Sequence, residues 1–558
     1  MNQIQLILTP QQAADKQQIQ KAVAQQLHLP FADIEDVRII RRSVDARQRN
    51  IKVLLTVQPV VKGISDNSLP PATPAFSPDY LDVHSAKRQV IIVGAGPAGL
   101  FAALTLLEHG IKPVILERGK EVSERKRDIA LLNRNEGLNP ESNYCFGEGG
   151  AGTFSDGKLF SRSKKRGDMQ RVMELFHYHG APESILYETH AHIGSDKLPS
   201  IIKNIRETVI NKGGEIHFNT KVTQLLIETG NAQSLNTENK ATGVITEDGT
   251  EYLGEAVILA IGHSAHDTYR MLVDNGVRVE TKGFAMGVRV EHPQALINRL
   301  MYHLGKKEHG ANKPDSDDDL VRLLGNASYS LVTQVDGRGV YSFCMCPGGH
   351  IVPAGSMSDG CVVNGMSASH RNSPFANSGI VVEIRPEDLT RPATLQNLRR
   401  DTTLSRLNTF DGLEGLRFQE YVEQLAAQHG QTPNKAPCQR LKDFVEGKPS
   451  KDLPPCSYLP GVVPSRLDLW LPPVIGKRLQ QGFRDFDRKY PGFLTNDAVI
   501  LGVESRSSSA VRIPRDKDSL QHTDILGLYP CGEGAGYAGG ITSSALDGIN
   551  AALAIAHL

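Results

Sequence analysis

The sequence is poor in cysteine, and its few cysteines do not follow a disulfide or metal spacing. Seven cysteines occur among 558 residues, and no Cys-x-x-Cys pair is present. This number is too small for a disulfide-stabilised scaffold and fits a reducing compartment. We therefore expect a cytoplasmic protein without a metal site.

An excess of charge of one sign is also absent, as is a typical targeting segment. The 62 basic and 62 acidic residues balance, which removes the global electrostatic argument for nucleic acid or an anionic membrane. The first residues lack the basic and apolar regions of a signal peptide. Residues 89–107 carry no charge, but three glycines and a proline follow a β-branched run there. This pattern predicts strand, turn and helix, and we expect no transmembrane segment.

Two of the cysteines, Cys344 and Cys346, are separated by a single residue in a stretch with strand character. At strand spacing their side chains would share one face. We interpret them as buried thiols in a β-sheet core rather than as a metal or redox pair.

The hydrophobic pattern divides the chain into five parts. Residues 1–62 are typical of a small β-α-β-β unit, similar in order to half a ferredoxin-like fold, and residues 63–87 have the composition of a proline-rich linker. Residues 88–282 alternate apolar strands with helices, which indicates a Rossmann-type α/β domain with a parallel sheet. Residues 283–500 predict an inserted, β-rich α+β substrate domain. Residues 501–558 return to the first domain and end in a helix.

The N-terminal unit is locally basic. Its arginines are Arg38, Arg41, Arg42, Arg47 and Arg49. They predict a solvated face, and docking to an acidic partner or RNA is the alternative interpretation.

Glycine, in contrast, is abundant, and the strongest motif is built from it. The 52 glycines exceed the usual share of about 7%. A G-x-G-x-x-G pattern between a predicted strand and helix is formed by Gly94, Gly96 and Gly99, with Pro97 at the start of the helix. This spacing allows a tight turn, a close approach of the backbone to a pyrophosphate, and close packing of helix on strand. Glu117 ends the next strand, where a carboxylate binds ribose hydroxyls, and Arg118 would cover the adenosine.

A second glycine cluster, in residues 527–550, resembles the distal flavin motif of the glutathione-reductase-type FAD/NAD(P)-binding superfamily. This resemblance implies that the dinucleotide is FAD. The resemblance implies that Gly532 and Glu533 hold the ribityl and phosphate region, although Glu533 is one methylene longer than the usual Asp. It also implies that the backbone at Gly540 and Ile541 meets the edge of the flavin, where a helix N-terminus stabilises negative charge.

Two intermediate segments resemble the same superfamily. The resemblance implies that Val222 clasps the adenine through its backbone and that Gly262 turns beside the cofactor. The glycine-rich loop at 147–158 adds Gly149 and Gly150, whose backbone freedom permits close approach to a ligand. A second G-x-G-x-x-G is absent between 270 and 500, so we expect NAD(P)H only as a transient electron donor.

Longer stretches resemble a bacterial family of uncharacterised FAD-dependent dehydrogenases over nearly the whole chain. They include CFGEGGAGTFSDGKL (145–159), GFAMGVRVEHPQ (283–294), NGMSASHRNSPFANSG (364–379) and GVESRSSSAVRIPR (502–515). This resemblance supplies no substrate.

Three residues are candidates for catalysis. Lys158 follows the glycine-rich loop and would lie near the flavin or a substrate carboxylate, or else at the surface. His263 follows Gly262, and a histidine can exchange protons near neutral pH, although a packed or helix-capping histidine is the alternative. Arg506 would clamp an anionic substrate with two hydrogen bonds, or form a structural ion pair.

Together these features predict an FAD-dependent oxidoreductase that transfers a hydride between a small substrate and flavin. The substrate and the electron acceptor stay open. One alternative is a flavin-dependent enzyme that modifies RNA or a cofactor and is recruited through residues 1–62. Another is a flavin-bound sensor without turnover.

Overall fold

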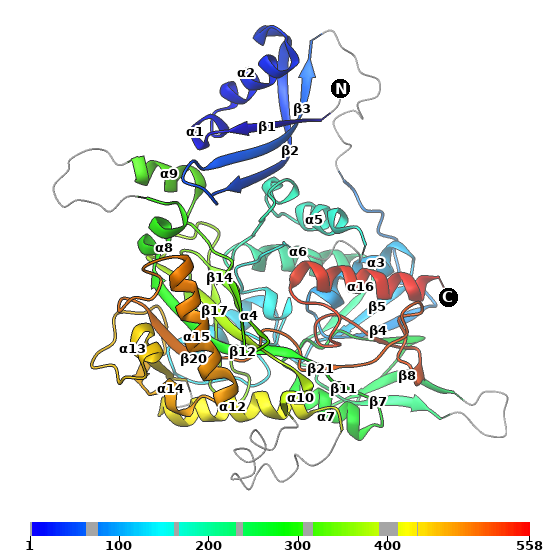
Figure 1. Ribbon diagram of the computed structural model, residues 1–558. Helices are drawn as coiled ribbons and strands as arrows, with labels where there is room; N and C mark the ends of the chain where they lie inside the picture. Colours follow the sequence, from blue (N-terminus) through cyan, green and yellow to red (C-terminus); the bar gives the residue numbers. More distant parts are fainter. Residues whose placement is uncertain are drawn as a thin grey trace.

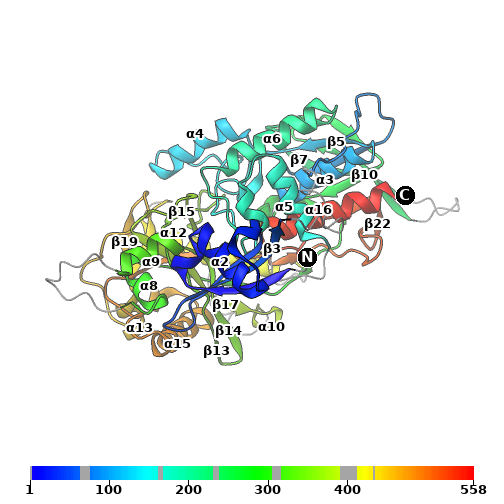
Figure 2. The ribbon, with the colours of Figure 1, turned by 90° about the horizontal axis from the view of Figure 1, so that it is seen from above.

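The computed structural model describes residues 3–62, 76–160, 167–229, 238–304, 316–389, 411–431 and 434–557. Figures 1 and 2 show a small N-terminal unit, an FAD-type α/β unit and a β-rich unit.

A five-stranded parallel sheet forms the centre of the α/β unit, with strand order β23-β10-β4-β5-β6. Its strands are β4 (Gln89–Val93), β5 (Lys112–Leu116), β6 (Glu215–His217), β10 (Ala256–Leu259) and β23 (Leu528–Pro530). The apolar runs QVIIV and AVIL are buried on both faces, as expected for parallel strands covered on both sides. The last strand, β23, comes from the C-terminal segment and pairs with β10 of the α/β unit.

Helices cover one face of this sheet, and a smaller mixed sheet covers the other. The helices are α3 (Pro97–Glu108), α5 (Met169–Tyr178), α6 (Leu198–Asn211) and α16 (Ile541–Ala556). The second sheet contains β7 (Val222–Glu228), β8 (Asn239–Thr246), β9 (Glu251–Leu253) and β22 (Ile525–Leu526), with α7 (His266–Asp274) beside it. Helices α3 and α16 lie side by side (Figure 1) because Gly548 lets them touch: a Cβ there would fall 2.0 Å from the carbonyl oxygen of Ala98.

The β-rich unit is built on a seven-stranded mixed sheet of order β13-β14-β17-β12-β20-β18-β19. These strands are β12 (Phe284–Pro293), β13 (Val332–Val335), β14 (Arg338–Cys346), β17 (Phe375–Ile384), β18 (Ala436–Arg440), β19 (Val462–Pro464) and β20 (Val499–Glu504). The helices packed around it are α8 (Gln294–Met301), α10 (Pro386–Leu389), α12 (Glu414–Gly430), α13 (Leu441–Glu446), α14 (Leu467–Trp470) and α15 (Pro473–Lys489). Strand β20 crosses the predicted domain boundary at residue 500, because its apolar residues pair with both β12 and β18.

Short elements complete the two large units. They are α4 (Val122–Asn133), α9 (Ser316–Leu324), β11 (Glu280–Thr281), β15 (His350–Pro353), β16 (Val363–Met366) and β21 (Val511–Arg512).

The N-terminal unit contacts both large units. Its elements are β1 (Ile4–Leu8), α1 (Pro10–Ala13), α2 (Lys16–Leu27), β2 (Ile34–Asp45) and β3 (Lys52–Val61). The antiparallel order β1-β3-β2 is that of half a ferredoxin-like fold, as predicted. Arg42 Nη1 lies 2.9 Å from Glu188 Oε1 of the α/β unit. His303 Nε2 of the β-rich unit lies 3.1 Å from the Ala46 carbonyl oxygen.

The predicted linker is only partly within the described structure. Residues 63–75 lie outside it. Residues 76–87 form neither helix nor strand, but Tyr80 and Val83 are buried against the α/β unit. The Val83 amide also donates to the Lys212 carbonyl over 2.8 Å, so this part of the linker is attached to the α/β unit.

The described helices include none with both the length and the apolarity needed to cross a bilayer. The described part of the chain also holds no group of three His, Cys, Asp or Glu side chains arranged for a metal ion.

Candidate active site

A cavity with about 1490 Å³ of empty space, counted out to its mouth, lies between the α/β unit and the β-rich unit. On one side it is lined by the turns that follow β4, β5, β10 and β23. These turns stand at the carboxyl ends of parallel strands, where open α/β sheets bind their ligands. Phe343, Cys344, Asn364, Arg506 and Ser507 line its other side.

Nearly all of the predicted cofactor residues line this cavity. They are Gly94, Gly96, Pro97, Glu117, Arg118, Gly150, Val222, Gly262, Gly532, Glu533, Gly540 and Ile541. The catalytic candidates Lys158, His263 and Arg506 line it too. The sequence therefore predicted a set of residues that the fold brings together from segments more than 400 positions apart.

Gly99 and Gly149 are the two predicted residues that do not line the cavity. A Cβ on Gly99 would fall 2.0 Å from the Gly94 carbonyl oxygen, so this glycine lets α3 pack on the turn. Gly149 has a φ of +77°, and its amide donates to the Ala95 carbonyl over 2.8 Å. Both glycines therefore support the turns through packing and hydrogen bonding, and they do not face the cavity.

The turn between β4 and α3 leaves an open approach to the backbone. Gly94 has a φ of +106°, which favours glycine. A Cβ on Gly96 would meet only the Cα of Gly150, at 3.9 Å. Because the first amides of a helix have no acceptor within the helix, the start of α3 presents donors to this space.

Glu117 is held by the backbone around it. Its Oε2 accepts from the Ala95 amide over 2.9 Å. Its Oε1 accepts from the amides of Gly119, over 2.8 Å, and Gly147, over 3.0 Å. The predicted ribose contact would come in addition to these bonds, since two carboxylate oxygens offer about four acceptor sites.

Arg118 lies in a cluster of charges at the predicted adenosine end. Its guanidinium binds both carboxylate oxygens of Asp267 at 2.8 Å and lies 4.2 Å from the centre of the Phe146 ring. Lys221 Nζ lies 2.9 Å from Asp267 as well. Burial alone would raise the pKa of Asp267, but these two cations hold that pKa well below its usual range.

The distal glycine segment meets His263 at the cavity. His263 Nδ1 lies 3.7 Å from Glu533 Oε2. The Gly532 amide donates over 2.7 Å to Asp547 of α16, and Arg515 binds the same carboxylate. Gly540, with a φ of +100°, begins α16. The start of this helix therefore points its free amides at the cavity, as it would at a flavin edge.

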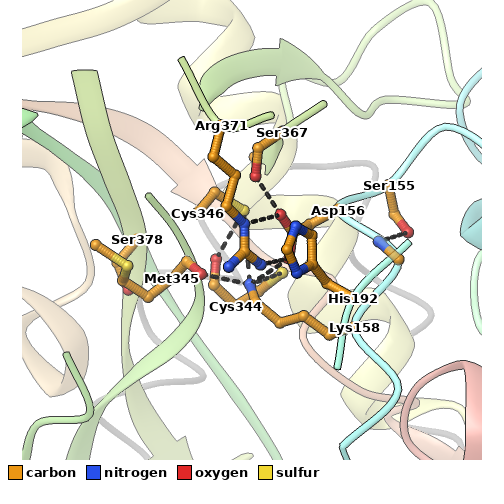
Figure 3. A network of polar contacts seen from close by, with 12 residues as sticks. Ser155, Asp156, Lys158, His192, Cys344, Met345, Cys346, Ser367, Arg371 and Ser378 are labelled. Carbon is orange, nitrogen blue, oxygen red and sulfur yellow. Dashed lines mark hydrogen bonds and ion pairs between the residues drawn. The ribbon is translucent and has the colours of Figure 1, made fainter. Parts of the chain in front are cut away.

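Lys158 belongs to a network of polar contacts that crosses from the glycine-rich loop to the β-rich unit (Figure 3). Its Nζ donates to the Met345 carbonyl and lies 3.4 Å from Asp156 Oδ2. Asp156 is buried and binds Arg371 Nη2 over 2.7 Å and the Ser367 hydroxyl. Although burial would raise it, Lys158 and Arg371 lower the pKa of Asp156 to about 2.

Cys344 and Cys346 do not form the regular strand face that the sequence predicts. Cys344 has a φ of +46°, and the pairing of β14 with β17 shifts register between Phe343 and Cys346. This bulge leaves Cys346 buried but brings Cys344 to the cavity wall. The prediction of two buried core thiols is therefore wrong for Cys344, because a bulge interrupts the regular pleat of the strand.

Arg506 is mostly engaged within the protein. Its Nε and Nη2 bind the buried carboxylate of Glu423, at 3.1 and 2.9 Å. Its Nη1 reaches the Ser356 hydroxyl at 2.7 Å and Cys145 Sγ at 3.7 Å. A guanidinium has five N–H donors, so little remains for a two-pronged clamp on a substrate, and the geometry is that of the structural ion pair.

The arginines of the N-terminal unit are also partly engaged. Arg41 Nε donates to Thr189 over 3.2 Å, Arg42 pairs with Glu188, and Arg47 binds Asp45. The contacts of Arg41 and Arg42 attach the N-terminal unit to the α/β unit.

The donor set of the cavity fits an FAD molecule. Its wall carries glycine turns with space for a diphosphate, two helix N-termini and a carboxylate at the end of β5. The close approach of Gly96 and Gly150 is the clearest sign, since a Cβ on Gly150 would fall 3.0 Å from the Gly96 Cα, and the two glycines together leave this part of the cavity wall without side chains. Gly96, Glu117, Gly532 and Gly540 would hold the cofactor.

Sequence reasoning missed Asp156, Arg371 and the position of Cys344. Asp156 lies only two residues before Lys158, and its place in the glycine-rich run was an available signal. No local sequence signal linked Arg371 and Ser367 to Asp156, because they lie more than 200 residues away from it in the chain.

Family models match most of the chain. Residues 87–253 match an FAD binding domain, and residues 283–507 match a model described as FAD-dependent protein, C-terminal domain-like. Residues 1–59 match a domain of unknown function. A protein of Clostridium beijerinckii, described as uncharacterized, is 38% identical over 553 residues, which cover 96% of this chain and 95% of that protein. FAD is thus the cofactor of this chain.

Solved structures show distant likeness only. A structure of CtdE in complex with FAD is 12% identical, covers 84% of each chain and has a TM-score of 0.29. A geranylgeranyl bacteriochlorophyll reductase-like protein from Thermoplasma acidophilum is 10% identical, covers 84% of this chain and 78% of its own, and has a TM-score of 0.33. At these scores the likeness carries no argument about activity.

Proposed function

Because this chain belongs to a family of FAD-dependent proteins, together with its uncharacterized relative from Clostridium beijerinckii, we propose that it is an oxidoreductase that dehydrogenates a small molecule. The observation that carries the proposal is a cavity that joins the glycine turns of the α/β unit to polar side chains of the β-rich unit. The order of the four flavin-type segments along the chain also supports a place in the glutathione-reductase-type superfamily.

In this proposal the α/β unit binds the cofactor and the β-rich unit binds the substrate. Gly94, Gly96 and Gly150 receive the diphosphate, Glu117 the ribose, and the start of α16 the flavin ring. Bound FAD supplies the acceptor for a hydride from a substrate C–H bond. Phe343, Asn364 and Ser507 form the opposite wall and orient the substrate.

His263 is the proposed acid–base residue. Its side chain is 14% exposed and lines the cavity beside Glu533. An imidazole that lines a cavity can exchange a proton with a bound substrate. His263 would accept the proton of a substrate hydroxyl or amine as the hydride leaves the adjacent carbon.

Lys158 and Arg506 have positioning roles. The buried carboxylates of Asp156 and Glu423 balance their charges. The two ion pairs fix the loop at 155–158 and strand β20 on the cavity wall.

The test is anaerobic spectroscopy of the purified holoprotein. A metabolite panel of alcohols, amines and hydroxy acids is added, and bleaching of the flavin bands identifies a substrate. We expect bleaching by at least one compound, and a His263→Gln variant that binds FAD normally but bleaches at least tenfold more slowly. NADH and NADPH are tested in parallel, because rapid bleaching by either would make the protein a reductase that uses a transient nicotinamide donor.

Two outcomes would contradict the proposal. Co-purifying RNA that lowers the rate of bleaching would favour the RNA-modifying alternative recruited through residues 1–62. A flavin that no donor reduces, while light reduces it slowly, would favour the sensor.

A further inference from the structure

The cavity wall contains a pair of cysteines, Cys344 and Cys346, that hydride transfer from a small substrate does not use. Lys158 Nζ lies 3.8 Å from Cys344 Sγ and 3.7 Å from Cys346 Sγ (Figure 3). The thiol of Cys346 donates a hydrogen bond to the backbone carbonyl of Cys344 over 3.3 Å. The bulge in β14 thus brings two thiols to one ammonium group at the edge of the FAD cavity.

A second cation also lies near this pair. The buried Arg289 donates from Nη2 to the Cys344 carbonyl over 2.7 Å and reaches Cys346 Sγ at 3.5 Å. Its other donors bind Asn377, at 2.9 Å, and Glu504, at 3.1 Å. These buried partners hold Arg289 in place, so the two cysteines lie near two fixed cations.

This environment activates one thiol in particular. The hydrogen bond from Cys346, with Lys158 and Arg289, brings the pKa of Cys344 well below its usual range despite burial. A thiolate is the form of cysteine that attacks a sulfur or a flavin. Cys344 is also the member of the pair that lines the cavity, whereas Cys346 is buried behind it.

We propose that Cys344 and Cys346 are a redox-active dithiol that exchanges two electrons with the FAD bound in the same cavity. In the oxidation step the Cys344 thiolate and the Cys346 thiol together lose two electrons, the S–H bond of Cys346 breaks and one Sγ–Sγ bond forms. The two electrons and the one proton pass to oxidised FAD, which becomes the anionic reduced cofactor. The reverse step opens the disulfide. A single residue separates the two cysteines, so the ring closed by the disulfide is small and strained, which favours a reversible bond over a permanent one.

The pair goes beyond the proposed function, because it depends on the FAD site and not on the small substrate. It doubles the electrons that one chain stores, from two to four. It also gives a path from the flavin to an acceptor that is itself a disulfide, by thiol–disulfide exchange at Cys344.

The first test counts electrons in the holoprotein. Protein oxidised with ferricyanide and desalted is titrated anaerobically with dithionite. The wild type should consume two two-electron equivalents per bound FAD, and Cys344→Ser and Cys346→Ser should each consume one. Cys145→Ser is the matched control, since Cys145 also lines the cavity but donates to the Ala354 carbonyl instead, and it should consume two. One equivalent in the wild type would overturn the proposal.

The second test needs neither a variant nor turnover. The same oxidised wild-type protein is unfolded, treated with iodoacetamide and cut with trypsin, which releases residues 339–371 as one peptide with Cys344, Cys346 and Cys361. We expect alkylation at Cys361 alone and a bond between the other two. Alkylation at all three cysteines would overturn the proposal even where a variant fails to fold. If no small molecule bleaches the flavin but both tests hold, the proposed function fails and the dithiol stands.

Discussion

Substitution of Gly96 by valine separates the binding of FAD from the folding of the chain. The backbone of Gly96 is extended, with φ −77° and ψ −176°, which valine adopts without strain. A Cβ there would meet only the Gly150 Cα, at 3.9 Å. The isopropyl group would therefore project into the space that the diphosphate is proposed to enter.

The expected loss of affinity is large compared with the loss of stability. Valine is a poorer N-cap than glycine, which costs about 1 kcal/mol of folding stability. Each lost hydrogen bond from an amide to a charged phosphate costs about 1.5–3 kcal/mol. Two such bonds amount to about 3–6 kcal/mol, which raises the Kd for FAD by a factor of about 10²–10⁴.

Thermal unfolding with and without FAD measures both effects. At a free FAD concentration of about 100 times the wild-type Kd, binding stabilises the wild type by about 2.7 kcal/mol. A variant with a hundredfold weaker Kd gains only about 0.4 kcal/mol at that concentration. The FAD-dependent rise in Tm should therefore nearly vanish in Gly96→Val, while the Tm of the apoprotein changes little.

Gly99→Val is the matched control, because it adds the same group three residues away in the same motif. Its Cβ would fall 2.0 Å from the Gly94 carbonyl oxygen, so it should destabilise the apoprotein by at least about 3 kcal/mol. The assignment is refuted if Gly96→Val keeps the wild-type rise in Tm with FAD, or if both variants lose stability alike.

Three further predictions follow from individual contacts. Glu117→Gln places an amide group against backbone N–H donors and should lower the stability of the apoprotein by about 1–3 kcal/mol in urea unfolding; an unchanged unfolding midpoint would contradict the contacts of Glu117. Lys158→Met removes a cation beside Cys344, so the pKa of this thiol should rise and the midpoint of the pH profile of its alkylation should move to higher pH. An unchanged pH profile of alkylation would disprove the effect. Burial raises the pKa of Glu291 to about 7, so its contribution to stability is present below its unfolded pKa and is lost as the pH rises from about 4.5 to 7. Glu291→Gln should therefore gain up to about 3 kcal/mol relative to the wild type over that interval, measured as the difference in the free energy of unfolding at the two ends.

The sequence predicted the cofactor half of the cavity because its signals are local. The strand β4, the glycine turn and α3 are contiguous in the chain, and the spacing of Gly94, Gly96 and Gly99 has a steric reason that does not depend on the rest of the fold. Glu117 was predicted from the same strand–helix–strand pattern, because it lies at the end of the second strand, β5. The distal glycines were found through resemblance, and the fold brings them to the same cavity.

The substrate half could not be predicted in the same way, because its contacts join distant positions. Arg506 was a candidate clamp until the fold placed Glu423 against it, 83 residues away. The bulge that exposes Cys344 depends on the pairing of β14 with β17, and nothing in the run SFCMC marks it. The pair of Asp156 and Arg371 likewise depends on how the two large units meet.

The most direct test of the account is a crystal structure of the protein with FAD. We predict the diphosphate against the backbone of Gly96 and Gly150, the ribose at Glu117, and the flavin ring at the start of α16, with His263 beside the ring and Cys344 on the opposite wall. An FAD molecule bound outside this cavity, or one whose flavin ring points away from the β-rich unit, would contradict the account.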